Sequence, residues 1–79
     1  MAKIVEDVMH APEGMRNAQL VRSAFSAGGY VGAGVLSAAE AAQSLDEAAA
    51  LIGLDPHERR ATIRSGLTAG AKYPFDMRR

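Results

Sequence analysis

The residues of this chain best suited to chemistry are basic residues near its C-terminal end. Arg60 and Arg64 are four positions apart, which places them on one face of a helix, and Arg59 lies beside them. The planar guanidinium group of arginine matches the geometry of phosphate oxygens. Ser65 is small enough for a nucleic-acid backbone to come near, and Lys72 adds positive charge. These residues predict a phosphate-binding face.

The arginines have an alternative use within the protein itself. From 37 to 58 every charged residue is acidic, whereas from 59 onward all but Asp76 are basic, so the net charge of zero hides a strong asymmetry. The arginines could instead pair with acids of the neighbouring helix, namely Glu40, Asp46 or Glu47. Both interpretations stay open from the sequence, although the zero total argues against a nonspecific DNA coat.

A second polar cluster lies at the start of a predicted helix. Asn17 is a residue type that commonly caps a helix N-terminus. Arg16 beside it opposes the helix dipole at a cost of about 0.3 to 1 kcal/mol, so its placement invites another reason. Both residues are therefore further candidates for nucleic-acid contact.

Catalysis and cofactor binding find little support in the composition. The chain has no cysteine, and with only His10 and His57 as imidazoles a zinc site is not expected. The glycines of "GAGVLS" lack the lysine and the spacing of a Walker motif. We expect a protein that is not an enzyme and holds no metal or cofactor.

The 79 residues predict a single domain, residues 1–79. Neither a membrane span nor a signal peptide is recognisable, so we expect a cytoplasmic protein without membrane contact. Abundant alanine and the lack of alternating apolar runs predict an all-α fold, a small bundle of four helices. The helices are expected at about 3–9, 16–33, 38–52 and 56–71, followed by a tail at 73–79.

Capping residues fix most of these boundaries. "SAAE" from Ser37 and "DPHE" from Asp55 each have the form of a capping box. Gly34 and Gly53, each followed by hydrophobic residues, predict left-handed stops of the preceding helices.

Hydrophobic spacing indicates which faces are buried. In the second helix we expect a buried face of Leu20, Val21, Ala24, Phe25, Gly28 and Val31. In the fourth helix we expect one of Ala61, Ile63, Gly66, Leu67 and Gly70. Glycines inside a helix cost roughly 1 kcal/mol each relative to alanine, so these positions predict a close approach, either by another helix or by a nucleic-acid backbone.

The order of these features resembles a known family. "APEGMRN", a helix ending at "VGAGVLS", "AAALIGLD" and "ERRATIRSGLTAG" are similar to the C-terminal helical accessory domain of bifunctional primase/polymerase and of phage and plasmid primases, of the actinobacterial type. The matching positions are Gly14, Arg16, Asn17, Gly53, Leu54, Arg60, Thr62, Ile63, Ser65, Gly66 and Leu67. The resemblance spans about residues 4–74.

The resemblance implies a replication-associated module without its catalytic part. We expect binding of single-stranded DNA or template–primer, with phosphates on the basic face and a ring such as Tyr30 or Tyr73 stacked on a base. One alternative is a phage-type interaction module that docks on a primase or helicase and assists or inhibits it. A third is a structural role as a homo-oligomer, since a small domain gains stability by burying a face against a copy.

Overall fold

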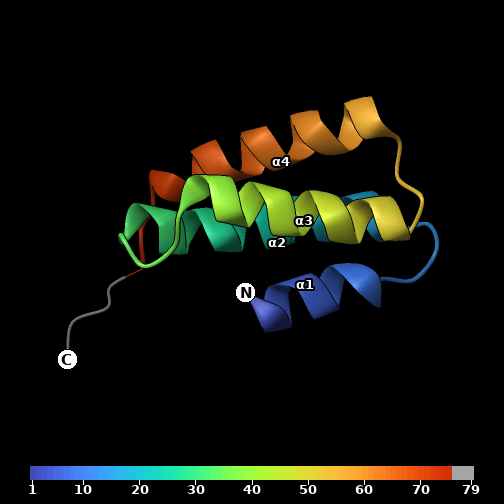
Figure 1. The fold of residues 1–79 in the computed structure, drawn as a ribbon, viewed down its shortest axis with the longest axis horizontal. Coiled ribbons are helices and arrows are strands. Elements are labelled where there is room, and N and C mark those ends of the chain that lie inside the picture. Colours follow the sequence, from blue (N-terminus) through green and yellow to red (C-terminus); the bar gives the residue numbers. More distant parts are fainter. Residues whose placement is uncertain (76–79) are drawn as a thin grey trace.

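The computed structural model describes residues 1–75. These residues form four helices and no strand. They are α1 (Ala2–Met9), α2 (Arg16–Gly32), α3 (Ala38–Leu51) and α4 (Pro56–Ala71). The all-α prediction is confirmed, and each helix boundary lies within one residue of the expected one. Figure 1 shows α4 on one side of the layer formed by α2 and α3, and α1 on the other. Accordingly, α1 and α4 each pack on both α2 and α3, and they do not contact each other.

Side-chain caps begin α3 and α4 as the sequence predicts. The Ser37 hydroxyl accepts a hydrogen bond from the backbone N–H of Glu40 at 3.4 Å. The Asp55 carboxylate accepts from the N–H groups of His57 at 3.0 Å and Glu58 at 3.1 Å. Both caps satisfy backbone donors that the helix itself leaves unpaired.

Glycines in the left-handed region end α2 and α3. Gly34, with φ of 78°, donates its N–H to the carbonyl of Val31, and Val35 donates to Tyr30, both at 3.0 Å. Gly53, with φ of 84°, repeats this pattern after α3. This pair of bonds is the Schellman motif, so both predicted stops are confirmed.

Replacing Asp55 with alanine should destabilise the fold by about 1 kcal/mol, because two N–H groups at the start of α4 lose their acceptor. Urea unfolding followed by helical circular dichroism measures this loss. Asp55→Asn keeps a capping oxygen and is the matched control, expected to stay close to the natural protein. Equal losses in the two variants would contradict the capping role.

The interpretation of Asn17 as an N-cap is wrong. Met15 occupies the cap position and provides no side-chain cap, and Asn17 lies inside the first turn of α2. The preceding turn sets this boundary: the N–H of Met15 bonds the Pro12 carbonyl at 2.9 Å, and Gly14 has a φ of 91°. A backbone turn therefore begins the helix two residues too early for Asn17 to be its cap.

The core consists of a few large aliphatic side chains among many alanines. Val8, Leu20 and Leu45 are the largest fully buried side chains, and Ile63 is 3% exposed. The remaining core residues are Ala24, Ala27, Ala41, Ala48 and Ala49. Small side chains at these positions let the helices lie close together.

The contact between α2 and α4 is the most extensive of the fold and is built on glycines. A Cβ on Gly28 would lie 2.6 Å from the Leu67 carbonyl oxygen, and a Cβ on Gly70 would overlap the Phe25 carbonyl oxygen. A Cβ on Gly66 would overlap Ala24. What approaches Gly66 and Gly70 is thus α2.

This close crossing also corrects part of the predicted core. Val21 is 47% exposed and Phe25 43% exposed, and Ala61 is exposed as well. The glycine contact brings the two backbones together, so side chains that flank it are displaced to its edge. Leu20, Ala24, Gly28, Ile63, Gly66 and Gly70 are buried as expected.

The segment after α4 turns back onto α2. The N–H of Phe75 bonds the Gly29 carbonyl at 3.2 Å, and its ring lies against Gly29 and Tyr30, with the Tyr30 and Phe75 ring centroids 4.7 Å apart. Residues 73–75 of the predicted tail therefore belong to the packed structure. Residues 76–79 lie outside the described part of the chain.

Candidate nucleic-acid interface

The face of α4 that points away from α2 carries most of the predicted site. Because Ile63, Gly66 and Gly70 are buried, the opposite face lies in solvent. We call this surface the outer face of α4, formed by Arg60, Arg64, Ser65, Thr68 and Lys72. All five are exposed, and among residues 1–75 the three cations form no ion pair. The structure thus brings together four of the seven predicted residues.

Arg59 has a different environment from its neighbours. Its Nε donates to the Asp46 carboxylate at 2.8 Å and its Nη1 to the Leu54 carbonyl at 3.0 Å. The Arg59 side chain is only 14% exposed. It joins α4 to α3 and is not available to phosphates. For Arg59, the alternative interpretation, an ion pair with an acid of the neighbouring helix, is therefore correct.

The two candidates at the start of α2 lie apart from the outer face. The Thr62 hydroxyl donates to the Asn17 side-chain oxygen at 3.4 Å, which links α4 to α2. Arg16 is half-buried, and its Nε has no hydrogen-bond partner in the described part of the protein. Neither residue extends the row of cations on α4.

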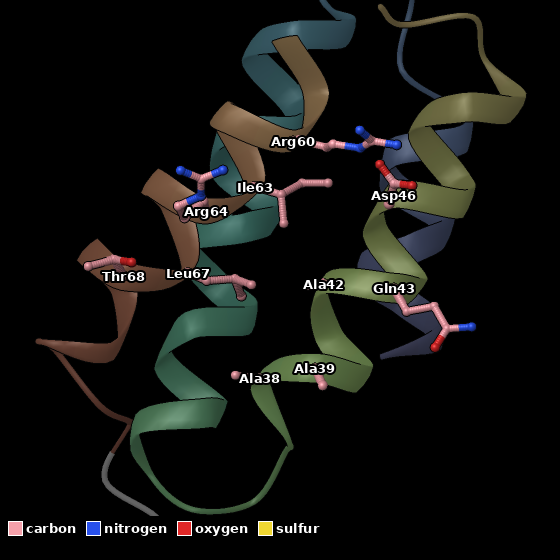
Figure 2. Close-up of a pocket in the computed structure, with 10 residues that line it drawn as sticks. All are labelled: Ala38, Ala39, Ala42, Gln43, Asp46, Arg60, Ile63, Arg64, Leu67 and Thr68. Atoms are coloured by element: carbon pink, nitrogen blue, oxygen red, sulfur yellow. The ribbon is translucent and has the colours of Figure 1, made fainter. Parts of the chain in front are cut away.

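An open groove runs between α3 and α4, on one side of the outer face (Figure 2). We call it the α3/α4 groove; its volume is about 620 Å³. Its floor is apolar, with Ile63 and Leu67 pointing from α4 toward α3. Its rim is polar, with Arg60 extending from α4 toward the α3 residue Asp46, and Arg64 one turn further along α4.

A second, smaller groove of about 390 Å³ lies on the other side of α4, against α2. Its walls include Val21, Phe25 and the outer-face residue Ser65. At one end the rings of Phe25 and Tyr73 stack with centroids 6.1 Å apart, and Tyr73 is 70% exposed. An exposed ring next to a groove offers a flat surface for a base.

The sequence identified only part of this aromatic surface. Tyr73 was a predicted stacking residue and is exposed, whereas Tyr30 is half-buried against Phe75. Hydrophobic spacing predicts a buried Phe25, because spacing alone gives no signal that a glycine crossing moves this side chain to the edge of the contact. The sequence indicates that crossing only through glycines inside the helices, Gly28 and Gly29 in α2 and Gly66 and Gly70 in α4.

Other kinds of site find no support in residues 1–75. No three His, Asp or Glu side chains there lie close enough together to hold a metal ion. None of the four helices is both long and apolar enough to cross a membrane. Neither histidine is buried: His10 and His57 are both exposed.

Comparison with known proteins adds no relative to these observations. No family model, curated protein or solved structure shows significant similarity to this chain.

Proposed function

We propose that this protein is a non-catalytic module that binds single-stranded DNA or a template–primer junction along the outer face of α4. One observation carries the proposal: Arg60 and Arg64 on α4 and Lys72 at its C-cap, spaced by four and eight residues, are all exposed, and none of them forms an ion pair with an acid within residues 1–75. Free cations in a row follow a phosphate backbone and release its counterions.

The surroundings of these cations favour a single strand. Ser65 and Thr68 place small polar side chains between the cations, so a backbone can come close to α4. Tyr73 follows Lys72 in the chain, and its exposed ring, stacked on Phe25, lies beside the second groove. A base can stack on such a ring only when it is unpaired, which a duplex does not allow.

The wider role proposed here follows from the resemblance to primase helical domains. We propose that the module works beside a primase or helicase, holding the template while another protein supplies the chemistry. It has no nucleotide-binding loop of its own in the sequence, so it supplies position alone. A location next to a replication gene on a phage or other mobile element fits this role.

Removing two of the cations should weaken DNA binding by at least about tenfold. The test variant is Arg60→Gln with Arg64→Gln, measured by fluorescence anisotropy on a labelled oligothymidylate of about 20 nucleotides at low salt. The control is Lys3→Gln with Arg22→Gln, which removes the same charge. Lys3 lies on α1, which does not contact α4, and Arg22 lies on α2.

The control variant should bind within about twofold of the natural protein, because general charge contributes little beyond direct phosphate contacts. Equal losses in both variants would mean that net charge alone drives binding. Unchanged binding of the Arg60→Gln, Arg64→Gln variant would contradict the proposal. Circular dichroism confirms that all variants keep their helices.

A further inference from the structure

The α3/α4 groove offers a docking surface with charges of one sign on its α4 side. Arg60 and Arg64 line that side above an apolar floor. The outward edge of α3 carries the opposite sign, because Glu40 and Glu47 are exposed and have no ion-pair partner within residues 1–75. We propose that the groove is occupied by α3 of a second copy of this chain, in a two-fold homodimer that places these acids on these arginines.

The internal packing fixes the register of the two helices. α3 and α4 run antiparallel, joined by the short loop after Leu51 (Figure 1). The pair between Asp46 and Arg59 shows which residues lie at the same height. Along the helix axes, residue numbers increase in opposite directions from this pair. Glu47 therefore lies level with the start of α4, near Arg60, and Glu40 lies close to the level of Arg64.

A two-fold axis parallel to these helices leaves the position of each residue along the axis unchanged, so equivalent residues of the two copies lie at the same level. The second copy's α3 then lies parallel to the first, over the groove, with its outward edge turned toward α4. Glu47 of one copy comes beside Arg60 of the other, and Glu40 comes beside Arg64. Because the same patch serves on both copies, each pair forms twice, as an isologous interface requires.

The apolar part of the same edge supports this occupant. Leu51 is 74% exposed, the most exposed of the large hydrophobic side chains in residues 1–75, and it lies one turn beyond Glu47. Ala50 is exposed on α3 as well, and Ala39, also exposed, lines the groove itself; these small side chains allow a second helix to come close. A single copy leaves all three facing water.

The homodimer would compete with the proposed DNA site. Both uses need Arg60 and Arg64, so DNA binding would favour the monomer and self-association would mask the outer face of α4. This competition rests on the proposed function, whereas self-association does not. The two are separable, because Glu47 belongs to the dimer contact and not to the cation row.

A charge exchange tests the dimer directly. Arg60→Glu alone and Glu47→Arg alone should each weaken self-association at least about tenfold, because two like-charged pairs replace two opposite ones. An equal mixture of the two variants should associate about as well as the natural chain, since each copy again finds opposite charges on its partner. Sedimentation equilibrium from about 1 µM to about 1 mM measures all three.

The natural chain should approach twice its monomer mass of 8.3 kDa at the upper concentrations. Glu6→Arg on α1 is the matched control for Glu47→Arg and should leave association unchanged, because α1 does not contact α4. A natural chain that stays monomeric throughout would overturn the inference. So would a mixture that associates no better than either variant alone.

Discussion

Gly70→Ala is expected to destabilise the fold by about 3 to 4 kcal/mol, a large share of the roughly 5 to 15 kcal/mol that stabilises a typical domain. The added methyl would overlap the Phe25 carbonyl oxygen and lie 3.0 Å from the Cα of Gly28. These are backbone atoms of α2, so no side-chain rotation relieves the overlap. The helices must separate instead and lose contact along their whole length. Urea unfolding by circular dichroism measures the loss.

Thr68→Ala is the control for this substitution, because Thr68 lies on the same helix but is exposed. Alanine favours helix over threonine by a few tenths of a kcal/mol, so this variant should be slightly more stable than the natural protein. If Gly70→Ala were equally stable, the close crossing of α2 and α4 would be refuted. The hypothesis that glycines pack the two helices would then have no basis.

Asp46→Asn is expected to cost about 2 kcal/mol, the second largest effect. The Arg59 side chain is 14% exposed, and the substitution removes the charge of its ion-pair partner, so that only neutral acceptors such as the Leu54 carbonyl remain. A cation largely removed from water without a counter-charge is unfavourable. Since Asp46 itself is 35% exposed, the cost falls below that of a fully buried pair.

Glu47→Gln separates this effect from a general loss of acidic charge on α3. Glu47 is the next residue, is exposed and has no ion-pair partner within residues 1–75, so its neutralisation should change the free energy of unfolding by less than about 0.5 kcal/mol. Both variants are compared by urea unfolding at low protein concentration. Equal effects at positions 46 and 47 would show that the pair with Arg59 adds no specific stability.

The elements of this fold could be predicted because local chemistry determines them. Ser37 and Asp55 begin helices through their own side chains, and Gly34 and Gly53 end helices through their own backbone conformation. None of these needs a partner distant in sequence. Asn17 failed as a cap because a neighbouring turn, and not its own chemistry, sets where α2 begins.

Packing between helices could be predicted only in part. The glycines of α2 and α4 indicated a close approach, but not that it would leave Val21 and Phe25 at its edge. Likewise, the contact of Phe75 with Gly29 joins residues that are far apart in the chain and carry no shared pattern. Such outcomes depend on how the helices cross.

The candidate site shows the same division. Helical spacing predicts that Arg60 and Arg64 share a face of α4, and both are exposed there. It could not separate Arg59 from them, because adjacent residues on a helix point in directions about 100° apart and only the position of α3 decides which one finds an acid. The sequence indicates Glu40, Asp46 and Glu47 as possible ion-pair partners of the arginines. Only the structure shows that Arg59 pairs with Asp46.

The salt dependence of single-stranded DNA binding tests the proposed role of the outer face of α4 most directly. Three phosphate contacts predict a slope of roughly −2 in log affinity against log salt, a loss of roughly fifteenfold between 50 and 200 mM. The Arg60→Gln, Arg64→Gln variant should show a slope of roughly −0.7, from the one cation that remains. A natural protein whose affinity does not change with salt, or a variant with the same slope as the natural protein, would contradict DNA binding by this face.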